Sequence, residues 1–197
     1  KEAVLGPRLH RIISGGGYLA PELAKNFQDL GISIAQGYGM SECSPKISSP
    51  DWSRPDKIVS VGRVVEGCQV RIADDEIQVK SPSVMMGYYK DPENTAQALT
   101  EDGWLRTGDI GYVDEEQFLY LTGRKKNLII LSNGENVAPE QIENMFEGER
   151  LIEDILVYEE DDAIAAEVYP NFKYAQAAGS TDIEGSIRQI IAEHNQA

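Results

Sequence analysis

The sequence predicts an α/β fold at the start of the chain and an α+β fold at its end, joined by a β-rich middle. A strand–helix–strand order opens the chain, hairpin patterns fill its centre, and the charge changes near residue 125. Residues 133–197 hold 15 Asp/Glu against 3 Lys/Arg, whereas the first 132 residues carry a net charge of only −3. We therefore expect the end of a large α/β subdomain over 1–60, a small β-rich subdomain over 61–123, a connecting segment at 124–126 and a small α+β C-terminal domain over 127–197.

The opening segment predicts an α/β crossover. Residues 9–17 predict a buried strand that ends in glycines, and residues 32–39 predict another. Between them, residues 20–31 predict a helix with Pro21 in its first turn and Gly31 as its C-terminal stop. Ligands of such units bind beyond the carboxyl ends of the strands. The glycine segments that follow both strands are therefore candidate binding loops.

The middle of the chain predicts short strands and turns. Residues 40–62 are rich in Ser and Pro and predict a loop. Further along, residues 68–80 predict a hairpin around an Asp-Asp turn, and residues 110–121 predict another. Between these hairpins we expect a turn and a short helix that begins at Pro92. Together these elements predict a mainly β region, built either as a small barrel or as a distorted sheet.

The acidic C-terminal segment predicts a strand and a helix, then two strands and a last helix. These elements are expected at 127–131, 139–148, 152–160, 162–170 and 181–197. Ile142, Met145 and Phe146 share one face of the first helix, which we expect to be buried. Thr181 or Asp182 is the expected cap of the last helix.

The composition excludes several classes of protein. A net charge of −15 argues against nucleic acid as a main partner, and most of the acidic excess is expected to form a solvated surface. No apolar run approaches the roughly 18 residues of a membrane span, and no signal-peptide pattern opens the chain. Cys43 and Cys68 have no paired spacing, which suits a reducing compartment. We expect a cytoplasmic protein; peripheral membrane contact and the oligomeric state stay open.

Two glycine segments carry the first candidate binding groups. The glycines of "SGGGYL", residues 14–19, leave the backbone open to close approach, although a plain turn explains them equally well. In "GYGMSE", residues 37–42, Tyr38 can present a flat ring to a base. Ser41 offers a hydroxyl to a phosphate, and Glu42 offers a carboxylate oxygen to Mg²⁺. The alternative is a buried tyrosine beside a helix-capping Ser-Glu pair.

The hairpin at 110–121 should bring Asp109 and Arg124 together, because they flank its two strands. A carboxylate can accept from the two vicinal hydroxyls of a ribose, and an arginine fork can hold a ribose or phosphate oxygen. The alternative is an exposed ion pair worth about 0–1 kcal/mol. The two residues alone favour this simpler interpretation.

Taken together, these segments resemble the adenylate-forming superfamily, which includes acyl-CoA synthetases, luciferases and peptide-synthetase adenylation domains. The resemblance rests on "SGGGYL", "GYGMSECSP", "EIQVKSPSVMMGYYKDPENT" and "GWLRTGDIGYVDEEQFLYLTGRKKNLIILSNGENVAPEQIE", in the family's order. It covers nearly the whole chain. The wording of "GRKKNLIILSNGENVAPEQIE" is most similar to long-chain fatty acyl-CoA synthetases.

The resemblance implies a nucleotide site and a hinge. The implied roles are an adenine-lining backbone at Gly16, Gly17 and Tyr18; adenine stacking by Tyr38 between Gly37 and Gly39; a catalytic hydroxyl at Ser41; Mg²⁺ binding by Glu42; ribose binding by Asp109 and Arg124; a catalytic hinge at Lys126; and approach to CoA by Gly134, Glu135 and Asn136. The chain departs from the family at positions 17 and 18, where Ala-Pro is more usual. It also has Ser41 where the family usually has Thr.

The implied enzyme uses ATP and Mg²⁺ to activate a fatty acid as acyl-adenylate and then passes the acyl group to CoA. The C-terminal domain would swing about Lys126 between the two steps. The family's phosphate loop and near-terminal lysine do not occur in these 197 residues, so we expect an internal part of a longer ligase that is inactive alone. Two alternatives stay open. One is an adenylating enzyme for another acid (aryl, short-chain or amino acid), with CoA or a carrier thiol as acceptor; the other is a non-catalytic nucleotide- or partner-binding module.

Overall fold

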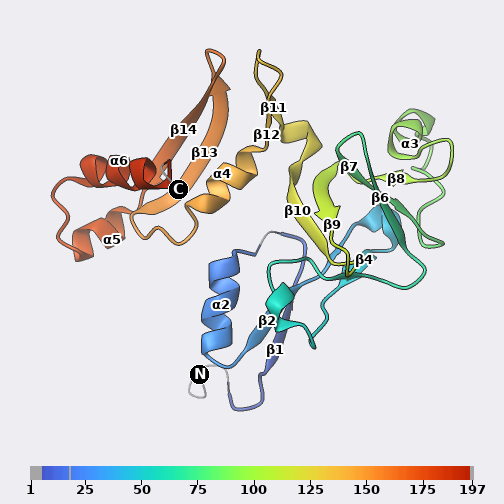
Figure 1. The fold of residues 1–197 in the computed structure, drawn as a ribbon, viewed down its shortest axis with the longest axis horizontal. Coiled ribbons are helices and arrows are strands. Elements are labelled where there is room, and N and C mark those ends of the chain that lie inside the picture. The colour runs from blue at the N-terminus through green and yellow to red at the C-terminus, as the bar shows by residue number, and fades with distance from the viewer. Residues whose placement is uncertain (1–5, 18, 196–197) are drawn as a thin grey trace. The chain divides into compact units, whose positions relative to one another are not determined.

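The computed structural model describes residues 6–17 and 19–195, and it contains two compact units, Lys1–Lys126 and Asn127–Ala197 (Figure 1). The elements before the boundary are β1 (Arg11–Ser14), α2 (Pro21–Asp29), β2 (Ser33–Gln36), β3 (Tyr38–Gly39), η1 (Ser41–Cys43), β4 (Lys46–Ser49), η2 (Pro55–Lys57), β5 (Arg63–Val64), β6 (Gln69–Ala73), β7 (Glu76–Lys80), α3 (Pro92–Ala98), β8 (Leu105–Arg106), β9 (Asp109–Val113) and β10 (Leu119–Arg124). The short 3₁₀ turn η3 (Lys125–Asn127) spans the boundary. After it come β11 (Ile129–Ile130), β12 (Asn136–Val137), α4 (Pro139–Met145), β13 (Ile152–Glu160), β14 (Ala163–Pro170), α5 (Phe172–Ala177) and α6 (Ile183–His194).

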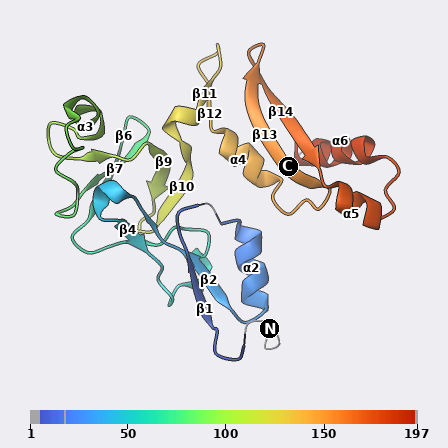
Figure 2. The same cartoon turned by 180° about the vertical axis from the view of Figure 1, so that it is seen from behind.

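The first unit begins with the predicted crossover. β1 and β2 pair in parallel, and α2 lies beside them in both views (Figures 1 and 2). The helix starts at Pro21, and Gly31 follows it in the left-handed region with φ +71°, as predicted. β1 is less buried than expected, since Ile13 is 66% exposed while Ile12 packs against the α2 core. Because α2 covers one face of these two strands, the alternate side chain of β1 stays in solvent.

The prediction of a loop over residues 40–62 is wrong at β4, which pairs with both β3 and β5. Ile47 is fully buried in this strand. The hydroxyl of Ser48 is also buried, and it donates to the carbonyl oxygen of Val61 at 2.5 Å. A four-residue strand with two serines has too few apolar positions to show alternation, so composition pointed to a loop.

The middle region contains the predicted hairpins. β6 and β7 join through Asp74 and Asp75, both in the left-handed region, as a tight two-residue hairpin turn requires. The short helix begins at Pro92 after Asp91, whose side chain caps it. The strands form separate open sheets, so the barrel alternative is wrong.

Side-chain packing joins these sheets where backbone pairing does not. One buried cluster contains Ile47 from β4, Ile77 from β7 and Leu119 from β10. Cys43 and Cys68, distant in sequence, also meet in this cluster, and both are free thiols. The β-rich region is therefore a set of small sheets around a shared core.

The second unit is built on the long antiparallel hairpin of β13 and β14, with α4 packed against β13. Its turn at Asp161 and Asp162 is left-handed at both positions. Phe146 is buried as predicted, whereas Met145 is 48% exposed, so the predicted apolar face of α4 is only partly covered. The expected strand at 127–131 is reduced to the two residues of β11.

The helices that close the second unit lie beside the β13–β14 hairpin (Figures 1 and 2). Asp182 caps α6 by accepting from the backbone N–H of Gly185, which selects it over Thr181. The short helix α5 was not predicted; Asn171 caps it by accepting from the N–H of Tyr174. Among the residues that the structure describes, no helix is both long and apolar enough to cross a membrane.

Candidate functional site

The two glycine segments meet at the carboxyl ends of β1 and β2. The N–H of Gly37 donates to the carbonyl oxygen of Ser14 at 3.0 Å. Gly16 has φ +85°, and neither Gly16 nor Gly17 has an atom within 4 Å of the position that a side-chain carbon would take. This backbone is open to approach from solvent. Tyr18 lies outside the described residues.

Tyr38, Asp109 and Arg124 form one connected group, although they are far apart in sequence. The Tyr38 hydroxyl donates to Oδ2 of Asp109 at 2.5 Å, and Arg124 Nε lies 2.9 Å from Oδ1. The side chain of Asp109 is 8% exposed and that of Arg124 is 56% exposed. The ion pair therefore has a buried carboxylate and a guanidinium that reaches solvent. Burial, followed by the charge of Asp109, raises the pKa of Tyr38 well above its ordinary value, which keeps the phenol protonated.

The backbone around Asp109 is held by Thr107, a residue that no sequence pattern indicated. The Thr107 hydroxyl donates to the carbonyl oxygen of Ile77 at 2.7 Å and accepts from the N–H of Asp109 at 3.1 Å. Both Thr107 and Asp109 are buried. A hydroxyl that bridges β7 to the first residue of β9 fixes where the carboxylate emerges.

Ser41 and Glu42 lie in the 3₁₀ turn η1, directly after β3. Gly39, just before this turn, passes so close to another segment that an added side-chain carbon would lie 1.5 Å from the Pro45 carbonyl oxygen. Glu42 Oε1 accepts from the hydroxyl of Tyr88 at 2.8 Å, and this hydrogen bond raises the pKa of Tyr88. Ser41 is exposed. Tyr88 is a second supporting residue that sequence patterns did not indicate.

The surroundings of Glu42 determine which kind of magnesium site it could form. In the described part of the chain, no three His, Cys, Asp or Glu side chains gather as a metal cluster. Mg²⁺ usually keeps several waters and binds through one or two carboxylates together with substrate phosphates. A single carboxylate beside the Ser41 hydroxyl fits that mode of binding and does not fit an all-protein metal cage.

The remaining predicted residues lie at the unit boundary and beyond it. Lys126 is exposed in η3, at the last position of the first unit. Gly134, Glu135 and Asn136 are exposed in the second unit, where Gly134 has φ +85° in the turn between β11 and β12. Asn133 shapes this turn, because its side chain accepts from the N–H of Glu135 at 2.8 Å.

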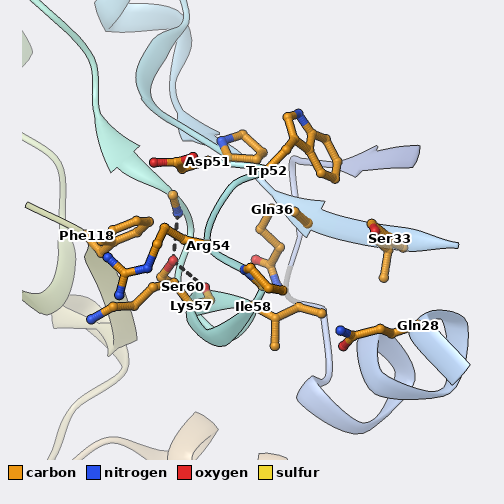
Figure 3. A pocket seen from close by; sticks show the side chains of 15 residues that line it. Gln28, Ser33, Gln36, Asp51, Trp52, Arg54, Lys57, Ile58, Ser60 and Phe118 are labelled. Carbon is orange, nitrogen blue, oxygen red and sulfur yellow. Dashed lines mark hydrogen bonds between the residues drawn. The ribbon is translucent and has the colours of Figure 1, made fainter. Parts of the chain in front are cut away.

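A separate cavity of about 40 Å³ lies between α2, β2 and the segment 50–62 (Figure 3). None of the predicted site residues lines it. Its cations are already paired, since Arg54 and Lys57 contact Glu116 at 2.6 and 2.8 Å and both lie over the ring of Phe118. This arrangement stabilises the cavity wall and leaves little charge for a ligand.

Comparison with known proteins places the chain in a family. Residues 1–89 match the family model described as AMP-binding enzyme. The chain is 40% identical over 156 residues to the long-chain-fatty-acid–CoA ligase FadD15 of Mycobacterium bovis, an alignment that covers 79% of this chain and 26% of that protein. It is 33% identical over 202 residues to the chloroplastic long-chain-fatty-acid–[acyl-carrier-protein] ligase AEE15 of Arabidopsis thaliana, covering 91% of this chain and 28% of the relative. The chain thus spans about a quarter of the length of these curated relatives.

Solved structures give the same family. O-succinylbenzoate coenzyme A synthetase (MenE) from Bacillus subtilis, in complex with ATP and magnesium ion, superposes with a TM-score of 0.71 at 31% identity. The match covers 81% of this chain and 36% of that one. The predicted fold class is confirmed by this likeness, and the chain belongs to the AMP-binding superfamily of adenylate-forming enzymes.

Proposed function

We propose that the protein is part of an acid–thiol ligase that activates a fatty acid with ATP and transfers the acyl group to CoA. The observation that carries the proposal is the buried Asp109 carboxylate, held between Tyr38 and Arg124. A buried carboxylate with defined partners on both oxygens is pre-organised to accept hydroxyls, as a ribose site must be. FadD15 supports the choice of a fatty acid and of CoA.

Asp109 has the hydrogen-bonding capacity that a ribose needs. A carboxylate offers about four acceptor positions, of which Arg124 and Tyr38 use two. Two positions are left for the 2′- and 3′-hydroxyls of a nucleotide. Arg124, being half-exposed, would donate to a ribose oxygen with the guanidinium nitrogens that Asp109 does not use, and the ring of Tyr38 would contact adenine.

The phosphates would be handled by the groups of η1. Ser41 would donate its hydroxyl to a phosphate oxygen, and Glu42 would hold Mg²⁺ with its carboxylate. The metal would neutralise charge that develops on the phosphate oxygens. Tyr88 would keep the Glu42 carboxylate in place through its 2.8 Å hydrogen bond.

The proposed reaction has two steps. A carboxylate oxygen of the acid attacks the α-phosphorus of ATP, which forms acyl-adenylate and releases pyrophosphate. The CoA thiol then attacks the acyl carbon, loses its proton, and releases AMP. We propose that the second unit turns about Lys126 between these steps and brings Gly134, Glu135 and Asn136 toward CoA. The position of Lys126 at the boundary of the two units supports this role.

Two relatives favour specific alternatives for the acid and the acceptor. MenE acts on O-succinylbenzoate, so an aryl acid is a candidate substrate. AEE15 is a ligase for an acyl carrier protein, so a carrier thiol is a candidate acceptor. The acid and the acceptor are therefore both to be varied in the deciding experiment.

The test is acid-dependent exchange of labelled pyrophosphate into ATP by the full-length polypeptide that contains this sequence. We expect exchange with long-chain fatty acids in preference to aryl, short-chain and amino acids, and AMP release on addition of CoA in preference to acyl carrier protein. Asp109→Ala should abolish most of the exchange, whereas Asp29→Ala, an exposed aspartate of α2, should leave it unchanged. Nucleotide binding without exchange, for any acid tried, would contradict the ligase and favour a binding module.

The role of Lys126 has its own test. Lys126→Pro fixes φ and removes a backbone donor at the proposed pivot. We expect pyrophosphate exchange to persist and thioester formation to slow by at least tenfold. Equal loss of both half-reactions would argue against a hinge at this residue.

A further inference from the structure

Lys125, the residue before the proposed hinge, is attached to the first unit by three contacts. Its backbone N–H donates to the carbonyl oxygen of Gly108 at 2.8 Å. Its ammonium donates to the carbonyl oxygen of Asp74 at 2.9 Å and lies 3.4 Å from Oε2 of Glu76. Lys125, which directly follows β10, is therefore held in a fixed position.

Glu76 links this lysine to the ribose-binding strand. Its side chain is only 7% exposed, and its other oxygen, Oε1, accepts from the N–H of Gly108 at 2.7 Å. Gly108 stands next to Asp109 and has φ +73°, a backbone conformation that favours glycine. One buried carboxylate thus holds both the residue before Asp109 and the residue after Arg124.

The residue after the proposed hinge is attached to the second unit. The side-chain amide of Asn127 donates to Oε1 of Glu140, in the first turn of α4, at 2.5 Å. Lys126 stands between these attachments, and it forms no ion pair with any residue that the structure describes. The three residues make up η3, a single 3₁₀ turn, which is a common form of backbone in connecting segments.

We propose that Glu76 and Glu140 are positioning residues that confine the hinge to Lys126, an inference that rests on the proposed two-step function. Glu76 immobilises Lys125 against the first unit, and Glu140 immobilises Asn127 against the second. Rotation is then limited to the backbone dihedrals of one residue, so the second unit can take few orientations. Asp109 and Arg124 keep their geometry during that rotation, because the same carboxylate holds the backbone beside both.

Amide hydrogen exchange measures the attachment directly and needs no activity. In the full-length polypeptide, the N–H groups of Lys125 and Gly108 should exchange more slowly than that of Lys126. Glu76→Gln keeps an acceptor for Gly108 but removes the charge that attracts Lys125, so exchange at Lys125 should rise roughly tenfold. Glu101→Gln, an exposed control in the same unit, should leave it unchanged. Equal exchange at Lys125 and Lys126 in the unmodified protein would overturn the proposal.

Separate measurements of the two half-reactions distinguish a positioning role from a purely structural one. Lys125→Met and Asn127→Ala change exposed side chains, so both variants should fold. Each should slow thioester formation about three- to tenfold, because a looser hinge spends less time in the productive orientation, and should leave pyrophosphate exchange within twofold. Lys125→Arg should restore the rate. Unchanged thioester formation in both variants, or a parallel loss of both half-reactions, would refute the role.

Different measurements test the attachment of Lys125 and the ligase activity. If no acid supports pyrophosphate exchange, the ligase proposal falls, while the exchange of the Lys125 amide still decides whether Glu76 fixes that residue. If the unmodified protein is an active ligase but Lys125 is unprotected, only the inference about the two glutamates falls.

Discussion

Removing the hydroxyl of Tyr38 tests how strongly the ribose-binding carboxylate is held in the folded protein. Tyr38→Phe keeps the ring but deletes the donor that lies 2.5 Å from Asp109 Oδ2. A hydrogen bond to a charged group contributes about 1.5–3 kcal/mol. Arg124 offsets part of the loss by remaining on the other oxygen, so we expect the free energy of unfolding to fall by about 1.5–2 kcal/mol.

Tryptophan fluorescence can follow the unfolding of the first unit. Both tryptophans, Trp52 and Trp104, lie in the first unit, so tryptophan fluorescence during urea unfolding reports that unit alone. Tyr112→Phe is the matched control, because Tyr112 is 51% exposed and stacks on Tyr120 through its ring. We expect the control to change the free energy of unfolding by less than about 0.5 kcal/mol.

An equal and small effect of the two substitutions would contradict this prediction. It would mean that solvent replaces the Tyr38 hydroxyl at no cost, and that Asp109 is held by Arg124 and Thr107 without it. An absorbance titration gives an independent check. Burial and Asp109 raise the pKa of Tyr38, so Tyr38→Phe should leave the number of tyrosines that ionise in the ordinary range unchanged.

Three further predictions follow from single contacts. Gly39→Ala should lower the free energy of unfolding, measured in urea, by about 2–4 kcal/mol, since its side-chain carbon would lie 1.5 Å from a backbone oxygen. Gly37→Ala is the control, because its nearest contact would be at 3.6 Å. Equal losses of stability in the two variants would contradict the close approach at Gly39. Burial raises the pKa of Cys68 to about 11, so iodoacetamide at pH 8 should alkylate it on the order of a hundredfold more slowly than a free thiol, as mass spectrometry would show. Hydrogen bonds from Arg54 and then Lys57 lower the pKa of Glu116 from 4.5 to about 2, so its contribution to stability should be present above pH 4.5 and be lost as the pH falls toward 2. Glu116→Gln should flatten that part of the acid-unfolding curve, and an unchanged curve would mean that the pairing is screened by solvent.

The sequence predicted those features that depend only on residues close together in the chain. Asp109 and Arg124 were expected together because alternating strands flank a polar turn, and the structure pairs them in register. Pro21 and Asp182 marked helix starts for the same kind of reason, since a first-turn proline and a capping side chain act on only a few neighbouring residues. These predictions required no knowledge of tertiary contacts.

What could not be predicted depends on contacts between distant residues. Glu76 lies 32 positions before Gly108, and nothing in its strand marks it as a buried carboxylate that faces a backbone N–H. Tyr88 reaches Glu42 across 46 positions. The exposure of Ile13 was missed because an apolar strand pattern does not reveal which face a helix will cover. Supporting residues are thus harder to find than binding residues, because the sequence around them carries no signature.

The two Asp-Asp turns have the same sequence, but the same substitution should affect their stability differently. At the first turn, Lys125 contacts the backbone carbonyl of Asp74, which any residue would supply, so replacing the pair by Asn-Gly should relieve left-handed strain at no loss. At the second turn, the Asp162 carboxylate accepts from both the N–H and the hydroxyl of Ser132. The same stabilising swap there would release the neighbouring loop that carries Gly134. Replacing both Asp-Asp pairs by Asn-Gly would therefore stabilise the β6–β7 hairpin and weaken the contacts of the β13–β14 turn.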